Sequence, residues 1–287
     1  MKTKIIILIC GALAFLFFLN APVDFPIDSI FKIEPGMSLR SVSYKLKEEN
    51  VIRSRSVFEV FIIIYGGDKK IISADYQFEK SLPVYEVARR IARGERHIAP
   101  VTVTIPEGFN NYEISEIFSL KLQNFNKDNF ISLVDGKEGY LFPDTYFFFS
   151  TDGETEVIKS MTENFNKKIE IIRKDIASSN RGEKEIIIMA SIIEKEAKGD
   201  TDRGFISGIL WKRLAIGMPL QVDAVLETYK TKGLPKDPAG NPGLEAIKAS
   251  IYPQSSPYLY YLHDKDGNIY YAKNFEEHKL NKEKYLK

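Results

Sequence analysis

Two glutamates, Glu194 and Glu196, close an apolar stretch that begins at Ile186. A carboxyl group set against apolar side chains loses solvation of its charged form, so its pKa rises and it stays protonated closer to neutral pH. Such an acid can protonate the leaving oxygen of a glycosidic bond, which is the first requirement for cleaving that bond. The same pattern is also typical of solvated glutamates that only end a helix, so the surroundings of each carboxylate decide between the two interpretations.

The helical spacing predicts different surroundings for these two carboxylates. Residues three, four and seven apart share one face of a helix, so Glu196 lies over the apolar side chains of residues 189, 192 and 193. Glu194 lies over a row that includes Ser191, and Lys198 follows it at the spacing that favours an ion pair. We therefore expect Glu194 to be solvated and take Glu196 as the better candidate for a general acid, with a solvated glutamate that only ends the helix as the alternative.

Two aromatic runs and one polar pair extend this hypothesis. The runs GYLFPDTYFFF (139–149) and PYLYYL (257–262) carry flat rings that can pack on sugars, although each run also fits a core strand. The stretch IGMPLQVDAV supplies Gln221 and Asp223 just after an amphipathic helix. These side chains can form hydrogen bonds with hydroxyl or N-acetyl groups, and they fit a role in a turn equally well.

The composition excludes several other classes of protein. Lysine and arginine number 40 against 39 aspartate and glutamate, so no excess of positive charge steers the chain toward nucleic acid. A single cysteine, Cys10, excludes a disulfide framework, and the three histidines lie far apart, without the spacing of a metal site. The sequence contains no phosphate-binding glycine loop or comparable cofactor motif. We therefore expect neither a metal nor an organic cofactor.

The N-terminal segment predicts the compartment. Two lysines precede an apolar run, Ile5–Leu19, which is slightly short for a membrane span but can cross a bilayer together with its flanks. Basic residues on the short side keep that end in the cytoplasm and place the remaining chain outside it. A cleaved signal peptide is the alternative, which Pro22 disfavours. We predict a single-pass anchor over residues 1–21 and a linker over residues 22–32.

Two domains are expected beyond the linker, and together they predict an α+β fold. Residues 33–103 show twice a turn followed by a short amphipathic helix, which indicates a small module of helices and strands. Residues 104–287 form a larger domain in which helices outnumber strands and two tyrosine-rich runs form a terminal hairpin. Helices in the larger domain are predicted over residues 111–123, 127–134, 154–179, 184–198, 203–215 and 243–250.

Five motifs in order resemble the YceG-like family of endolytic murein transglycosylases over nearly the whole chain. They are EGYLFPDTY, MASIIEKEA, RLAIGMPLQVDAV, NPGLEAIKASIYPQSSPYLYYL and FEEH. The resemblance implies a lyase anchored by one helix in the inner membrane, with its catalytic domain facing the periplasm or the cell exterior. It also implies cleavage of peptidoglycan strands at the β-1,4 bond between N-acetylmuramic acid (MurNAc) and N-acetylglucosamine (GlcNAc), which leaves 1,6-anhydro-MurNAc ends and stops strand elongation. The module over residues 33–103 resembles the LysM-like domain of the family, and peptidoglycan synthases are the implied partners.

The resemblance also assigns roles to single residues. The second glutamate of the family's central motif is the catalytic acid and base, and it matches Glu196 here. Further motif positions, with an implied role in substrate binding, are matched by Glu194, Gln221, Asp223, Glu138, Asp144 and Tyr146. The chain departs from the family in two places, because the segment before Gly233 is shorter than in many members and Ile269 stands where members commonly have a histidine.

The implied chemistry needs only one carboxylate. A lytic transglycosylase uses the C6 hydroxyl of the muramic acid as an intramolecular nucleophile, whereas a hydrolytic glycosidase uses two carboxylates. Two alternatives stay open. One is a hydrolase on the same substrate with Asp223 or Glu194 as the second carboxylate, and the other is a wall-binding scaffold without catalysis.

Overall fold

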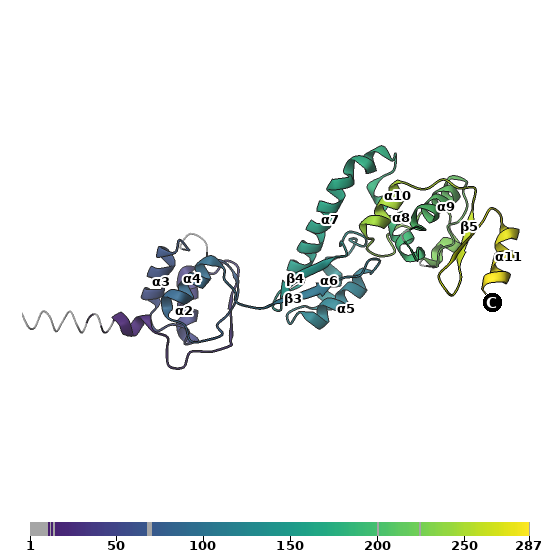
Figure 1. The fold of residues 1–287 in the computed structure, drawn as a ribbon. Helices are drawn as coiled ribbons and strands as arrows, with labels where there is room; N and C mark the ends of the chain where they lie inside the picture. The colour runs from purple at the N-terminus through teal and green to yellow at the C-terminus, as the bar shows by residue number, and fades with distance from the viewer. Residues whose placement is uncertain are drawn as a thin grey trace, which may run out of the picture. The chain divides into compact units, whose positions relative to one another are not determined.

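The chain folds into two compact units, Met1–Ala99 and Pro100–Lys287 (Figure 1). The computed structural model describes residues 11, 13, 15–67, 71–199, 201–223 and 225–286. Three two-stranded antiparallel sheets accompany the helices in this part of the chain, so the fold is α+β as predicted. The boundary between the units lies four residues before the predicted one. Strand β3 (Pro100–Thr104) pairs with β4 (Thr145–Phe149) and therefore belongs to the second unit.

In the described part of the first unit after residue 29, three short helices and one sheet pack together. Its elements are β1 (Ile30–Ile33), α2 (Leu39–Glu48), α3 (Arg55–Ile64), β2 (Ala74–Gln77) and α4 (Val84–Arg93). Ser38 caps α2 as the sequence predicts, since its side chain accepts a hydrogen bond from the backbone N–H of Ser41. Gly94 ends α4 in the left-handed conformation, which costs glycine no steric strain.

The last residues of the predicted linker over residues 22–32 belong to a strand. Strand β1 begins at Ile30 and pairs with β2, and both Phe25 and Phe31 are buried in the core of the first unit. Most of the predicted anchor over residues 1–21 lies outside the described residues. Among the residues that the structure does describe, no helix is both long and apolar enough to cross a membrane.

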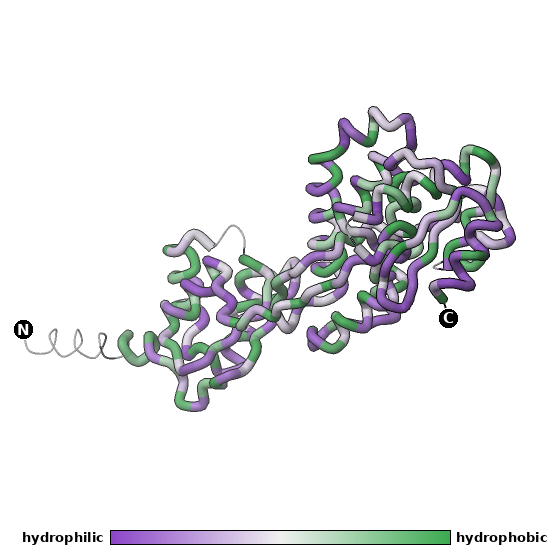
Figure 2. Tube along the Cα trace, turned by 45° about the vertical axis from the view of Figure 1, so that its right-hand side comes forward, coloured by the Kyte–Doolittle hydropathy of each residue, from purple (hydrophilic) through white to green (hydrophobic). Residues whose placement is uncertain are grey.

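The second unit contains two hydrophobic clusters that share one long helix. Its elements after β3 are α5 (Asn111–Lys121), α6 (Lys127–Leu133), β4, α7 (Glu154–Ser178), α8 (Glu183–Glu196), α9 (Arg203–Ala215), η1 (Leu226–Tyr229), α10 (Leu244–Ile251), β5 (Tyr260–His263), β6 (Ile269–Ala272) and α11 (Phe275–Tyr285). The first half of α7 packs with β3, β4 and α5, and its second half packs with α8 and α10. Hydrophobic and hydrophilic residues alternate along the helices, as expected where one face packs on a core (Figure 2).

Helix α8 is the centre of the second cluster and positions both glutamates. All eight residues from Ile186 to Ile193 are buried, because α9 and α10 pack against the helix (Figure 1). Each large apolar side chain buried in this way contributes about 1.5–3 kcal/mol to folding. The chain becomes extended at Ala197, so Glu196 is the last helical residue.

The terminal hairpin forms as predicted. Strands β5 and β6 pair with Tyr261 opposite Tyr271, and the Asp264 carboxylate holds the connecting turn by accepting hydrogen bonds from two backbone N–H groups. Helix α11 follows the hairpin and was not predicted from the sequence. It is almost entirely polar, and His278 is its one buried residue among those described.

Candidate active site

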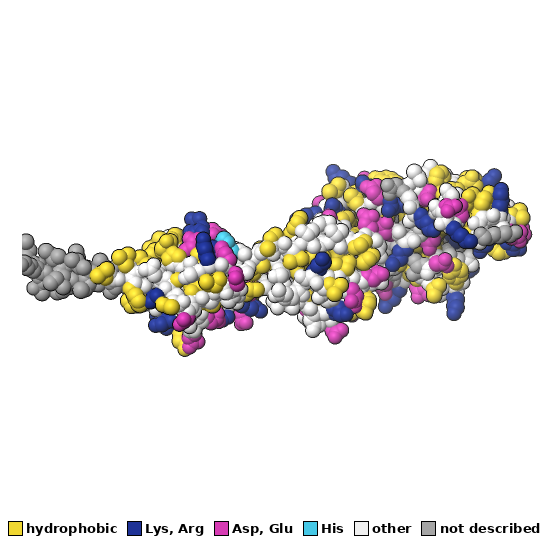
Figure 3. Space-filling view, turned by 60° about the horizontal axis from the view of Figure 1, so that its bottom comes forward, with side chains coloured by type: hydrophobic (Ala, Val, Ile, Leu, Met, Phe, Trp, Pro, Cys, Tyr) yellow, Lys and Arg dark blue, Asp and Glu magenta, His cyan; other side chains and the backbone are white. Residues whose placement is uncertain are grey.

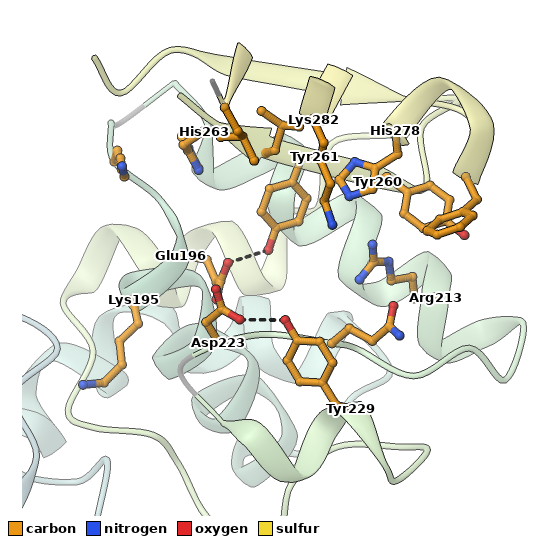
Figure 4. Close-up of a pocket in the computed structure, with 15 residues that line it drawn as sticks. Lys195, Glu196, Arg213, Asp223, Tyr229, Tyr260, Tyr261, His263, His278 and Lys282 are labelled. Carbon is orange, nitrogen blue, oxygen red and sulfur yellow. Dashed lines mark hydrogen bonds between the residues drawn. The ribbon is translucent and has the colours of Figure 1, made fainter. Parts of the chain in front are cut away.

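A cavity of about 850 Å³ opens at the C-terminal end of α8 (Figure 4). Its walls come from the ends of α8 and α9, the segment 221–229, the hairpin and α11. Three of the predicted site residues line it, namely Glu196, Gln221 and Asp223. The structure adds residues that the sequence reasoning did not assign, chiefly Arg213, Tyr229 and Tyr261.

Glu196 projects into this cavity and is hydrogen-bonded there. The hydroxyl of Tyr261 on β5 donates to Oε2 of Glu196 at 2.9 Å. Burial, and then the neighbouring Glu196 carboxylate, raise the pKa of Tyr261 well above its usual value, so the hydroxyl keeps its proton. Tyr261 therefore acts as a fixed donor that orients the carboxyl group of Glu196.

Asp223 is the second carboxylate of the cavity. The hydroxyl of Tyr229 donates to its Oδ1 at 2.6 Å, and this hydrogen bond raises the pKa of Tyr229 to about 12. Figure 4 shows that Glu196 and Asp223 point into the same part of the cavity, between Tyr261 and Tyr229. Although the segment before Gly233 is short, it still brings Tyr229 into the cavity wall.

Arg213 on α9 contacts the segment before Gln221 and the start of the hairpin. Its Nε donates to the carbonyl oxygen of Leu259 at 2.7 Å, and its Nη1 donates to the carbonyl oxygen of Leu220. The guanidinium carbon lies 5.1 Å from the centre of the Tyr260 ring. Burial lowers the pKa of Arg213, but a guanidinium stays protonated in proteins, so its positive charge is fixed near the carboxylate of Glu196.

Glu194 lies outside the cavity, and the expectation that it is solvated is wrong. Its side chain is only 6% exposed and lies 3.0 Å from the guanidinium of Arg203 on α9. It also accepts a hydrogen bond of 2.8 Å from the backbone N–H of Gly243, which precedes α10. The predicted pairing with Lys198 is replaced by these contacts, because α9 and α10 enclose this end of α8.

Glu138 lies in a different part of the second unit. It accepts hydrogen bonds of 3.2 Å from the backbone N–H of Asn111 and from Nδ2 of Asn241, a fully buried residue. Asn241 also binds the backbone of Phe109 and Leu141, so this network ties three segments together. Glu138 lines a separate cavity of about 980 Å³.

Asp144 and Tyr146 are also apart from Glu196. The carboxylate of Asp144 accepts a hydrogen bond from Asn164 on α7 at 3.0 Å and lies 3.6 Å from Lys168. The hydroxyl of Tyr146 donates to the carbonyl oxygen of Phe142 at 2.6 Å, and its ring lies in the core beside β3. Asn164 also donates to the hydroxyl of Tyr146 at 3.1 Å, so both residues join the start of β4 to α7, and neither lines the cavity that holds Glu196.

Glu138 predicts a pH dependence of stability. Burial raises its pKa from 4.5 to about 7, so the folded state keeps the proton over a range in which the unfolded chain has lost it. Stability contributed by this group is therefore full below pH 4.5 and falls by about 1–3 kcal/mol as the pH rises to 7. The variant Glu138→Gln has no titrating group at this position. Its stability relative to the wild type should therefore be higher at pH 8 than at pH 5, as measured by thermal melts of both proteins. An equal difference at the two pH values would contradict the assignment.

Replacement of Tyr261 by phenylalanine is expected to lower the rate while the fold stays intact. Tyr261→Phe keeps the packed ring and removes the hydrogen bond to Glu196, and hydrogen bonds to charged groups contribute about 1.5–3 kcal/mol, or roughly 10- to 100-fold in rate. Turnover of purified glycan strands, the substrate that the sequence motifs imply, should fall by this factor while the melting temperature changes little. The matched control is Tyr258→Phe, since Tyr258 stacks on Tyr271 in the same hairpin and does not line the cavity. Equal rates in the two variants would remove Tyr261 from the mechanism.

A glutamate fixed by a tyrosine, beside a second carboxylate and a buried arginine, is the arrangement of an enzyme that uses acid–base chemistry. The model of the YceG-like family matches residues 31–227 and 226–284, so the chain belongs to this family.

Two relatives with similar sequences carry the same name, endolytic murein transglycosylase. An endolytic murein transglycosylase of Bacillus subtilis is 26% identical over 303 residues, which cover 88% of this chain and 84% of the relative. An endolytic murein transglycosylase of Streptococcus pneumoniae is 26% identical over 316 residues, and these cover 87% of this chain but only 57% of that longer protein. The crystal structure of a YceG-like protein from Listeria monocytogenes superposes with a TM-score of 0.59 at 25% identity, covering 88% of this chain and 99% of the other.

Proposed function

We propose that the protein is an endolytic lytic transglycosylase of peptidoglycan. It cleaves the β-1,4 bond between MurNAc and GlcNAc within nascent glycan strands, leaves 1,6-anhydro-MurNAc ends and thereby stops strand elongation. The observation that carries this proposal is the position of Glu196, a carboxyl group held by Tyr261 at the edge of a polar cavity. The names of the relatives from two organisms support the same substrate and reaction.

In the proposed reaction Glu196 acts twice. It first gives its proton to the glycosidic oxygen, so the bond from C1 of MurNAc to that oxygen breaks and GlcNAc leaves with a free hydroxyl. The C6 hydroxyl of the same MurNAc then bonds to C1 and returns its proton to Glu196. No water is consumed, and the attack is favoured because nucleophile and electrophile belong to one sugar.

The other cavity residues are proposed to bind the strand. Asp223 and Gln221 can accept or donate hydrogen bonds to sugar hydroxyl and N-acetyl groups, and exposed faces of the tyrosine rings can pack on the sugars. The positive charge of Arg213 attracts the carboxylate that Glu196 becomes after proton transfer. None of these steps involves a metal or an organic cofactor.

A hydrolase is the second candidate, because Asp223 points into the same part of the cavity as Glu196 (Figure 4). Two carboxylates on either side of a glycosidic bond are the machinery of hydrolytic glycosidases. Mass spectrometry of digested peptidoglycan separates the two reactions. Anhydro ends support the transglycosylase, and reducing ends support the hydrolase. Strands that are bound but not shortened would support the scaffold without catalysis.

We propose further that the segment 1–21 anchors the chain in the inner membrane and that the second unit acts outside the cytoplasm. The two lysines before the apolar run set this orientation. In this arrangement the first unit, with its LysM-like sequence, lies next to the membrane and can bind the glycan strand. Peptidoglycan synthases, which make the strand, are the proposed neighbours.

A further inference from the structure

We infer that an apolar surface of the first unit rests on the lipid bilayer beside the anchor. We call this the α3 surface, and it consists of Val60, Ile63 and Ile64 on α3 together with Tyr85 on α4. The inference goes beyond the proposed reaction and rests on the proposed anchor at residues 1–21.

Helix α3 is apolar on opposite sides of its last two turns. Phe58 and Ile62 face inward and are fully buried in the core of the first unit. Ile63 and Ile64 stand three and four residues after Val60 on the outer side, and Val60, Ile63 and Ile64 are 54%, 55% and 65% exposed. A soluble helix normally carries polar residues on its outer side, but the polar residues of α3, Arg55, Ser56 and Glu59, all lie in its first half.

Tyr85 connects the α3 surface to the N-terminal segment. A groove lined by Leu16, Leu19 and Tyr85 joins the end of that segment to α4. The Tyr85 ring in turn lies 6.1 Å from the ring of Phe61 on α3. Figure 3 shows hydrophobic side chains gathered on the part of the first unit that adjoins the N-terminal segment.

The length of the apolar run explains why a bilayer would reach this surface. Residues 5 to 19 are fifteen residues, and a helix of that length measures about 22 Å, against about 30 Å for the hydrocarbon core of a bilayer. A span that is too short draws flanking groups toward the hydrocarbon. The groups that flank this run on its C-terminal side are those of the first unit, including Tyr85 of the α3 surface.

The side chains at the junction also suit a membrane interface. Phe17 and Tyr85 are aromatic, and such residues are enriched where hydrocarbon meets headgroups. The Arg53 guanidinium lies 4.1 Å from the centre of the Phe17 ring and donates to the carbonyl oxygen of Ala21 at 2.9 Å, so a positive charge stands at the headgroup level. Valine and isoleucine side chains offer no hydrogen bond to a sugar, so a glycan is a poor occupant of the α3 surface.

The test places a fluorescent label on the α3 surface in the full chain. On a Cys10→Ser background, Ile63→Cys and the control Lys47→Cys on the exposed side of α2 are each labelled with an environment-sensitive fluorophore. The proteins are reconstituted at a low protein-to-lipid ratio into vesicles of phosphatidylethanolamine and phosphatidylglycerol that carry a nitroxide on the upper acyl chain. We expect blue-shifted emission and several-fold stronger quenching by the nitroxide at position 63 than at position 47.

Three outcomes would overturn the inference. Equal quenching at both positions would show that the α3 surface has no special contact with lipid. A blue shift at position 63 without nitroxide quenching would assign the surface to a protein, either a second copy or another partner. Failure of the protein to float with the vesicles would remove the anchor itself. Because none of these measurements uses glycan cleavage, their failure is distinguishable from failure of the proposed reaction.

Discussion

Replacement of Glu196 by glutamine is expected to abolish turnover while the fold stays intact. Glutamine keeps the size of the side chain and can still accept the hydrogen bond from Tyr261, but it cannot release a proton to the leaving oxygen. General acid–base catalysis contributes about 10²- to 10⁴-fold in rate. We expect a loss at the upper end of this range, because the same carboxyl group serves both halves of the proposed reaction.

The measurement is the release of 1,6-anhydro ends from purified glycan strands, with thermal melts of each variant. The matched control is Glu227→Gln on η1, an exposed glutamate close in sequence to Asp223 that does not line the cavity. The control should turn over at the wild-type rate. If Glu196→Gln retained activity within a few-fold of that control, Glu196 would not be the acid.

The helices were predictable from the sequence where their pattern was amphipathic. The predicted helix over residues 203–215 coincides with α9, and the one over 154–179 differs from α7 by a single residue, since the apolar positions of both recur at helical spacing. Helix α11 carries no such pattern because nearly all of its residues are polar. Strand β1 has only four residues, and its partner β2 lies more than 40 residues away, so local sequence could not identify it.

The site was predictable only in part, for a different reason. Glu196, Gln221 and Asp223 come together because Glu196 ends α8, while Gln221 and Asp223 follow α9, which packs beside α8. The surroundings of Glu194 depend on Arg203 and Gly243, which reach it from other elements. Helical spacing describes contacts within a single helix. It therefore could not predict the contacts that neighbouring elements make with α8. The roles implied for Glu138, Asp144 and Tyr146 in substrate binding stay predictions, because these residues lie apart from Glu196.

Replacement of Glu194 by glutamine is expected to destabilise the second unit. Glu194 and Arg203 form an ion pair whose side chains are 6% and 15% exposed, and removal of one partner from a buried pair costs about 3–5 kcal/mol. Glutamine can keep the hydrogen bond from the Gly243 N–H, and Arg203 still faces the Glu107 carboxylate at 3.9 Å, so the loss comes from the weaker pairing of Arg203 and from the lost interaction with the N-terminus of α10. For a domain of this size the melting temperature should fall by about 6–20 °C.

Thermal and urea unfolding measure this change, with Glu276→Gln as the matched control. Glu276 forms an ion pair with Lys279 at 3.0 Å but is 79% exposed, so its loss should change stability by less than about 0.5 kcal/mol. Well below its melting temperature, Glu194→Gln should keep most of its turnover, because Glu194 lies outside the cavity. Substitution of Glu196 is thus expected to lower the rate, whereas substitution of Glu194 is expected to lower the stability. A Glu194→Gln protein that melts like the wild type but is inactive would reverse the assignment of the two residues.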